Sequence, residues 1–305
     1  MTRLRAICLA GPTGVGKTAA ALALARAVDG EVINTDSRQV YADFPLITAQ
    51  PSPEERAEAP HHLYGCLPTT ERITAGRWCA AALDIARDVA ARGKTPLFVG
   101  GTGLYFKALL EGMAAIPPVP AVVHAAVAAR CAGEGLAAMH DALRRVDPEA
   151  AARIHPHNRQ RVARALEVYE ATGKPLSWWH SHAASPAPCE GLYLGLATTL
   201  DALTPRLARR IELMLAAGAL DEARAALARC PDRTAPGWTG IGCAELGRHV
   251  AGEIDLDQCV ELWLRHTRQY AKRQLTWFRA VPGLLWHEPT ALTPLCQKAQ
   301  KFLGR

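Results

Sequence analysis

The amino-acid sequence predicts an α/β protein with a kinase-like P-loop core, built on a parallel sheet and interrupted by a helical insertion domain. Three observations predict this class. Short apolar segments alternate with helical segments early in the chain, a glycine-rich phosphate-binding motif follows the first of them, and strand character is lost in the middle. Strands separated by helices are typical of βαβ units, whose parallel sheets are covered on both faces.

The core elements follow in order along the first part of the chain. Apolar runs bounded by turn residues predict strands at residues 5–10, 31–35 and 95–99. Helical periodicity predicts helices at 18–28 and 78–92. Each predicted strand is therefore followed by a turn and then by a segment that can cover the sheet.

The middle of the chain is predicted to be the insertion. Pro117, Pro118 and Pro120 break the α/β pattern, and a helical stretch then continues to about His182. Strand character returns at 191–198, and the remainder is mostly helical with a candidate last strand in GLLWHEP. The predicted division is 1–113 for the first part of the core, 114–190 for the insertion and 191–305 for the second part of the core.

Composition limits the class of protein. The chain has 305 residues, 49% hydrophobic and 21% charged, and a net charge of +6 that permits a polyanionic partner without requiring one. Its nine cysteines are odd in number and lack zinc-finger spacing, which favours a reducing compartment. The first residues resemble a strand more than a signal peptide, and no uncharged stretch is long enough to span a membrane. We expect a cytoplasmic protein without a membrane segment, and nothing in the sequence requires more than a monomer.

The phosphate-binding motif is G-x-x-x-x-G-K-[ST], present as Gly11-Pro12-Thr13-Gly14-Val15-Gly16-Lys17-Thr18. Glycines let backbone N–H groups turn inward around phosphate oxygens, and the N-terminus of the following helix favours negative charge. Lys17 adds a full positive charge, and the Thr18 hydroxyl can bind a magnesium ion that bridges the phosphates. A strand before the motif and a helix after it provide the expected context. The loop is predicted to bind a phosphate chain.

The residues that follow the third strand limit which class of phosphate-binding protein this can be. A motor or switch NTPase should offer an aspartate at the end of a further strand to hold magnesium. Residues 95–99 are followed instead by Gly100-Gly101-Thr102-Gly103. The sequence therefore disfavours a motor or switch NTPase and leaves kinases and other transferases that bind a diphosphate as candidate classes.

Two more strand ends are expected at the same edge of the sheet. Asp36 follows the second strand, and Thr102 lies in the second glycine-rich turn. Ligands of open parallel sheets bind beyond the carboxyl ends of the strands. From its position, Asp36 can serve as a magnesium ligand, a general base or a helix cap, and Thr102 can donate to a phosphate oxygen. Glycines beside Thr102 would let a ligand approach the backbone closely.

An ordered set of motifs resembles the tRNA dimethylallyltransferase family, also called tRNA isopentenyltransferases or IPP transferases. The motifs cover nearly the whole chain. They are GPTGVGKT, DSRQVY, TAQPSPEE, HHL, GKTPLFVGGTGLY, RALEVYEATGKP and AKRQLTWFR.

The resemblance implies a reaction and roles for the site residues. Dimethylallyl diphosphate would donate its five-carbon group to N6 of the adenine next to the anticodon on its 3′ side, forming N6-(dimethylallyl)adenosine and releasing diphosphate. Asp36 would be the general base for N6, and Thr102 would contact the diphosphate near its bridging oxygen. Lys17, Thr18 and Mg²⁺ would stabilise the charge on the leaving diphosphate.

The resemblance also implies an RNA partner, the tRNA anticodon stem-loop, whose target base must be extruded into a pocket. The expected RNA-contacting residues are Asp36, Ser37, Arg38, Gln39, Thr102, His124, Gln160, Arg161, Val162, Ala163, Arg164, Lys272 and Arg273.

The predicted C-terminal helix supports RNA binding independently. At about 100° per residue, its basic side chains share one arc and its aromatic side chains another. The basic set is Arg265, Arg268, Lys272 and Arg279, and the aromatic set is Trp263, Tyr270, Trp277 and Phe278. A stripe of one sign suits a phosphate backbone, although a soluble amphipathic helix has the same pattern.

Two positions depart from the family pattern, and three other functions remain consistent with parts of the sequence. His124 replaces an arginine, and Gly242-Cys243-Ala244-Glu245 replaces Gly-Tyr-Arg-Gln.

The first alternative, an adenylate isopentenyltransferase acting on free nucleotides, would not need the insertion with its Gln160–Arg164 segment. The phosphate loop alone would also suit a small-molecule P-loop kinase. A non-catalytic RNA-binding module would leave Asp36 and the phosphate loop without a purpose.

Overall fold

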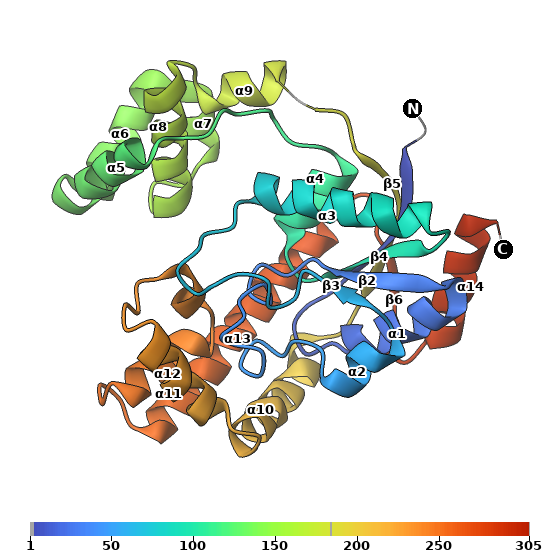
Figure 1. Ribbon diagram of the computed structural model, residues 1–305. Helices are drawn as coiled ribbons and strands as arrows, with labels where there is room; N and C mark the ends of the chain where they lie inside the picture. Colours follow the sequence, from blue (N-terminus) through green and yellow to red (C-terminus); the bar gives the residue numbers. More distant parts are fainter. Residues whose placement is uncertain (1–2, 184, 305) are drawn as a thin grey trace. The chain divides into compact units, whose positions relative to one another are not determined.

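The computed structural model describes residues 3–183 and 185–304, which form two compact units (Figure 1). The first unit comprises the described residues of 1–110 and 188–305, and the second spans 111–187. Both boundaries of the second unit lie three residues before those given from the sequence, 114 and 190. Each unit is described separately below.

A six-stranded sheet forms the centre of the first unit, with the strand order β3-β2-β4-β1-β5-β6. Every pair in it is parallel, and β1 lies between β4 and β5. The strands are β1 (Leu4–Ala10), β2 (Gly30–Asn34), β3 (His61–His62), β4 (Thr95–Gly100), β5 (Cys189–Leu196) and β6 (Leu285–His287). The predicted strands are confirmed to within two residues, but the two-residue edge strand β3 was not predicted because it is too short to show a period.

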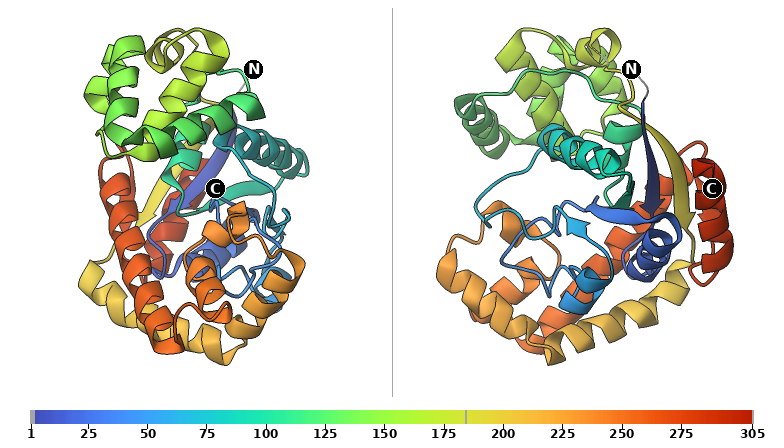
Figure 2. Two further views of the ribbon diagram at one scale, coloured as in Figure 1. Left: turned by 90° about the vertical axis from the view of Figure 1, so that its left-hand side faces the viewer. Right: turned by 45° about the vertical axis from the view of Figure 1, so that its right-hand side comes forward.

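Helices cover both faces of this sheet (Figure 2). The helices of this unit are α1 (Lys17–Val28), α2 (Pro53–Glu58), α3 (Ala75–Ala91), α4 (Gly103–Leu110), α10 (Leu200–Ala216), α11 (Ala219–Arg229), α12 (Cys243–Val250), α13 (Leu256–Arg279) and α14 (Leu292–Leu303), with a short 3₁₀ helix at Pro236–Thr239. Among them, α11, α12 and the 3₁₀ helix pack in a separate apolar cluster away from the strands.

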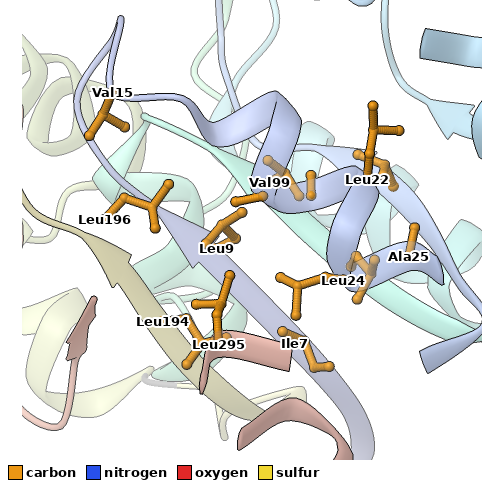
Figure 3. Packing of buried hydrophobic residues seen from close by; sticks show 14 of the residues in the cluster. Ile7, Leu9, Val15, Leu22, Leu24, Ala25, Val99, Leu194, Leu196 and Leu295 are labelled. Carbon is orange, nitrogen blue, oxygen red and sulfur yellow. The ribbon is translucent and has the colours of Figure 1, made fainter. Parts of the chain in front are cut away.

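Alternation along β1 decides which helix packs on which face. Ile7 and Leu9 point to a cluster formed with α1 and α14, as Figure 3 shows with Leu24 and Leu295. Ala6, Cys8 and Ala10 point to the other face, because successive side chains of a strand alternate. Their small size leaves room for large aromatic side chains of α3 and α4 to pack on the sheet.

The long helix α13 connects three parts of the first unit. Its Trp263 packs in a cluster with α10, α11 and α12, Leu275 packs on the α1 side of the sheet, and Phe278 packs on the α3 side. Asp255 begins the helix with a capping box, in which its side chain accepts from Gln258 N. Residues from 263 to 278 are thereby held against the sheet edge that carries the phosphate loop.

The second unit consists of five helices with their own apolar core. They are α5 (Ala121–Gly133), α6 (Gly135–Val146), α7 (Pro148–Arg153), α8 (Arg159–Thr172) and α9 (Leu176–His182). Asp147 is buried and joins two of them, since it accepts from Ala150 N at the start of α7 and from the Ser177 hydroxyl of α9. The predicted helical insertion ending near His182 is confirmed.

No helix among residues 3–183 and 185–304 is long and apolar enough to cross a membrane.

Candidate functional site

The phosphate loop connects β1 to the first turn of α1. Gly14 and Gly16 have φ angles of 78° and 105°, which favour glycine. A Cβ atom at Gly14 would also lie 2.6 Å from Leu207 Cδ2 of α10. Lys17 Nζ donates to the carbonyl oxygens of Gly11 and Pro12, both at 2.9 Å. The lysine is therefore held across its own loop, where a bound phosphate chain would meet it.

A pocket of about 300 Å³ opens at this loop, at the carboxyl ends of β1, β2 and β4. It brings together residues predicted from the sequence with two arginines that were not predicted. Its polar lining includes Thr13, Lys17, Thr18, Asp36, Gln39, Arg206 and Arg210, and its apolar lining includes Val32, Ala49, Pro51 and Tyr64. One end of the pocket suits a phosphate chain and another part suits a small hydrocarbon group.

Positive charge exceeds negative charge in this pocket. The pKa of Lys17 is lowered to about 8, mainly by burial; the charge of Asp36 opposes this shift, and the charge of Arg210 adds to it. Burial also lowers the pKa of Arg210, whose Nη1 donates to Thr13 Oγ1 at 3.4 Å. Buried cations that disfavour one another gain stability from an anion, so the arrangement favours a di- or polyphosphate.

The arginines Arg206 and Arg210 come from α10, nearly two hundred residues after the loop. Their i, i+4 spacing places them on one helix face beside Leu203 and Leu207, which are buried in the core. That spacing is the sequence feature from which the two pocket arginines could have been predicted. It is weak, because the exposed Arg209 lies between them and equally spaced arginines are common on solvated helices.

The turn that carries Asp36 is fixed by the fully buried Asn34. Asn34 Oδ1 accepts from Asp36 N at 2.8 Å, and Asn34 Nδ2 donates to Asp36 O at 3.0 Å and to Leu63 O at 2.9 Å. Asp36 Oδ1 accepts from Arg38 N at 2.9 Å, so the carboxylate caps a turn. Because residues 35–40 are not helical, the helix-cap alternative for Asp36 is wrong.

Thr102 lies directly beside this turn. Its hydroxyl oxygen accepts from Ser37 N at 3.0 Å, and its own N–H donates to Thr35 O at 3.1 Å. The hydroxyl also donates to Ser37 Oγ over a longer distance of 3.4 Å. The structure therefore brings together three of the predicted features: the phosphate loop, Asp36 and Thr102.

The glycines around Thr102 meet protein atoms, not open space. A Cβ at Gly100 would lie 2.1 Å from Thr35 O, at Gly101 2.1 Å from Gln274 Nε2, and at Gly103 2.0 Å from Trp277 Nε1. The sequence interpretation, close approach of a ligand, therefore needs correction. These glycines allow β2 and α13 to approach the Thr102 turn.

Residues after Asp36 contact neighbouring loops. Arg38 Nη1 donates to Thr239 Oγ1 at 2.8 Å and to Pro236 O at 3.2 Å. Gln39 Nε2 donates to the carbonyl oxygens of Thr48 and Ala49. These side chains hold the loops that surround the pocket.

The basic side chains of α13 are mostly exposed, as the helical pattern predicted. Among the described residues, Lys272, Arg273, Arg265 and Arg279 make no ion pair, while Arg268 lies 3.9 Å from Asp201. The aromatic set is not uniformly buried, because Trp277 is 37% exposed. The Trp277 ring lies against Gly103, which follows Thr102.

In the second unit, the predicted RNA-contacting residues differ in their surroundings. Gln160 and Arg161 are exposed, and Arg164 and Ala163 are partly buried. Val162 is fully buried in the core of the unit, so its side chain is not available to RNA. His124 Nδ1 lies 3.0 Å from Glu167 Oε1 and takes part in the packing of α5 on α8.

The second departure from the family pattern has a structural explanation. Cys243 is fully buried, and Glu245 is buried while its Oε1 lies 2.6 Å from His266 Nδ1. Glu245 Oε2 also accepts from Gly242 N at 2.6 Å. Residues 242–245 do not line the pocket at the phosphate loop.

The pocket suits magnesium only together with a phosphate ligand. The Thr18 hydroxyl and the Asp36 carboxylate both line it, and oxygen donors are the ligands that Mg²⁺ prefers. Within residues 3–183 and 185–304, no group of three or more His, Cys, Asp or Glu side chains could hold a metal ion. The residues present therefore fit an ion that shares its coordination with the phosphates.

The fold and this site define a P-loop protein whose phosphate-loop motif lies close to a carboxylate and a hydroxyl group. The match to a family model is more specific. The model described as IPP transferase matches residues 39–281, and the chain belongs to this family.

Relatives and solved structures agree with this assignment. The chain is 62% identical over 286 residues to a tRNA dimethylallyltransferase of Desulfovibrio desulfuricans, covering 94% of this chain and 88% of the relative. It is 55% identical to one of Oleidesulfovibrio alaskensis, covering 98% of both. The structure of a Bacillus halodurans tRNA isopentenylpyrophosphate transferase is similar with a TM-score of 0.72 and 31% identity, covering 99% and 96% of the two chains. A eukaryotic dimethylallyltransferase acting on tRNA gives 0.83 and 29%, covering 98% of this chain and 79% of the other.

Proposed function

We propose that this chain transfers a dimethylallyl group from dimethylallyl diphosphate to N6 of the adenine that follows the anticodon in tRNA. The observation that carries the proposal is the pocket that holds the phosphate loop and Asp36, with the Thr102 turn bonded directly beside it. Membership of the IPP transferase family and the names of the relatives support it.

In the proposed reaction, the lone pair of N6 attacks C1 of the donor. The C1–O bond breaks, its electron pair leaves with diphosphate, and one N6 proton passes to Asp36. Arg38 N–H donates to Oδ1 of Asp36, and no described residue donates to Oδ2, so Oδ2 is the more accessible oxygen for the proton. The products are N6-(dimethylallyl)adenosine and diphosphate.

The diphosphate has a binding site of sufficient charge. The loop N–H groups, Lys17, Arg206 and Arg210 surround one end of the pocket. Preorganised donors of this kind stabilise the charge that develops on a leaving group. The same loop type that holds a transferred phosphate in kinases would here hold the departing diphosphate.

Thr102 is suited to act at the bridging oxygen. The Thr102 hydroxyl accepts from Ser37 N, interacts with the side chain of Tyr270, and donates to Ser37 Oγ over a long 3.4 Å. Such a bond is weak and is readily exchanged for one to a phosphate oxygen. When Mg²⁺ is bound through Thr18 and the diphosphate, it would add further charge neutralisation.

The proposed acceptor is the anticodon stem-loop of tRNA. Exposed Lys272 and Arg273 of α13 would contact its phosphates beside the pocket, and Gln160 and Arg161 of the second unit are available for further contacts. Arg38, Ser37 and Gln39 would support the extruded base through the loops that they hold. Val162 would contribute packing only.

The experiment is incubation of the protein with Mg²⁺, dimethylallyl diphosphate and an unmodified anticodon stem-loop, followed by mass spectrometry. We expect one five-carbon addition, absent in Asp36→Asn and retained in the control Asp84→Asn, whose side chain is 76% exposed on α3. Addition to free AMP but not to RNA would identify an adenylate isopentenyltransferase. Transfer of a γ-phosphate from ATP, with neither addition, would identify a kinase.

A further inference from the structure

Three side chains of α13 lie along the turn that carries Thr102. They are Tyr270, Gln274 and Trp277, whose i, i+4, i+7 spacing places them on one face of the helix. Tyr270 lies beside Thr102, whose side chain opposes the rise in the pKa of Tyr270 that burial causes. Gln274 and Trp277 reach Gly101 and Gly103, the neighbours of Thr102 on either side. This face of α13 therefore forms a support for the turn.

Gln274 also contacts the phosphate loop. Its Oε1 accepts from Thr13 N at 2.9 Å, and its Nε2 donates to Gly101 O at 2.9 Å. Gln274 is 4% exposed; its bond to Gly101 O is buried, and its bond to Thr13 N is partly buried at the pocket. One buried amide thus connects the backbones of the two glycine-rich loops.

The contact leaves little freedom to either loop. A neutral amide is the side chain that can accept at one end and donate at the other. The absence of a side chain at Gly101 is what admits Gln274, because a Cβ there would lie 2.1 Å from Nε2. Loss of the amide would leave a buried N–H and a buried C=O without partners, which both loops would move to satisfy.

We propose that Gln274 is a positioning residue that fixes the phosphate loop relative to Thr102. This inference rests on the proposed function, in which the loop holds the diphosphate and Thr102 contacts its bridging oxygen. Misplacement of reacting groups by about 1 Å lowers rates by about 100-fold. The effect should therefore appear in kcat for the transfer, while the exposed RNA-contacting surface of α13 is unchanged.

Two variants and a control test the proposal. Gln274→Met keeps the approximate volume and removes both hydrogen bonds. Gln274→Glu keeps the shape, and its neutral acid can still accept from Thr13 N and donate to Gly101 O, whereas its carboxylate cannot donate. Gln269→Glu is the control, because Gln269 is exposed on the same helix and makes no side-chain hydrogen bond to a described residue.

We expect Gln274→Met to lower kcat by about 10- to 100-fold, with the KM for the stem-loop within about twofold of the wild type. For Gln274→Glu, the ratio of its kcat to that of the wild type should rise by about tenfold as pH falls from about 8.5 to 6, because burial raises the pKa of a carboxyl group. The titratable groups around this position are Tyr270, Lys17, Arg210 and Asp36. They are common to both proteins, so their titration cancels in the ratio.

A purely structural role predicts different results. Gln274→Met would then lower the melting temperature but keep kcat per folded molecule, and the Gln274→Glu ratio would be independent of pH. Either result overturns the proposal. If the wild type transfers no five-carbon group, the proposed function fails. The affinity for inorganic diphosphate, measured by calorimetry, is then compared between the variants in place of kcat. Recovery of diphosphate affinity by Gln274→Glu at low pH then supports the connection of the loops, and no recovery overturns it.

Discussion

Substitution of Asn34 by alanine is the most direct test of how the Asp36 turn is held. Asn34 is fully buried, and its side chain makes three hydrogen bonds of 2.8, 3.0 and 2.9 Å, two of them to the backbone of Asp36. Its backbone carbonyl, which accepts from Trp78 Nε1, is retained in the variant. Asn34→Ala therefore removes the side-chain clamp without removing the strand.

The magnitude follows from the number of bonds. Three net contributions of about 1 kcal/mol each give a destabilisation of about 3 kcal/mol. Thr199→Ala is the comparison in the same unit, because Thr199 is exposed and makes a single capping bond to Ala202 N at 3.2 Å. Loss of that cap should cost about 1 kcal/mol.

Urea denaturation followed by circular dichroism measures both values. A second measurement is kcat at a temperature where both variants remain folded. We expect Asn34→Ala to lower kcat by about 100-fold, since Asp36 loses both backbone restraints, and Thr199→Ala to leave it unchanged. The reasoning is refuted if Asn34→Ala is no more destabilising than Thr199→Ala, or if it transfers the prenyl group at the wild-type rate.

Four further predictions concern the pocket and the loops beside it. Because the pKa of Lys17 is lowered to about 8, donor affinity should fall as pH rises from about 7 to 9, and Lys17→Arg should remove this dependence in steady-state KM measurements. For folding, the unfolded lysine binds more protons in the window from about 8 to 10.4, so this group makes stability rise with pH there, as urea titrations can check. Arg210→Met should raise the donor KM by about tenfold, whereas Arg209→Met, which changes an exposed arginine of the same helix, should not. Gly101→Ala should lower kcat and melting temperature because its Cβ would lie 2.1 Å from Gln274 Nε2, while Gly76→Ala, with no atom within 4 Å, should raise the melting temperature slightly.

The sequence predicted the parts of the site that depend on local pattern. The phosphate loop follows from its own glycines and Lys17, and its strand and helix follow from apolar periodicity. Asp36 and Thr102 could be placed near it because the carboxyl ends of parallel strands share one edge of the sheet. The structure adds the bond from Ser37 N to Thr102 that joins them.

The remaining parts depend on contacts between distant segments, which local pattern does not contain. Arg210 enters the pocket from α10, and Gln274 enters between two loops from α13. Helical periodicity placed Trp277 on the apolar side but could not show that its ring packs against Gly103 and is still 37% exposed. Val162 was named from a contiguous motif, although the helical period directs it into the core of the second unit.

The glycines of the Thr102 turn show how the C-terminal helix enters the chemistry. Read alone, Gly100-Gly101-Thr102-Gly103 resembles a second phosphate-binding turn, and the catalytic groups that the sequence predicted, Asp36 and Thr102, lie within the first 110 residues. In the structure, this segment does not form the site alone. Side chains of α13 occupy the space beside Gly101 and Gly103, and one of them, Gln274, lies 173 residues after Gly101 in the chain. The same helix exposes Lys272 and Arg273 on its solvent side. RNA bound at Lys272 would therefore contact the helix whose opposite face carries Gln274, so we expect a shift of α13 on RNA binding to displace both glycine-rich loops.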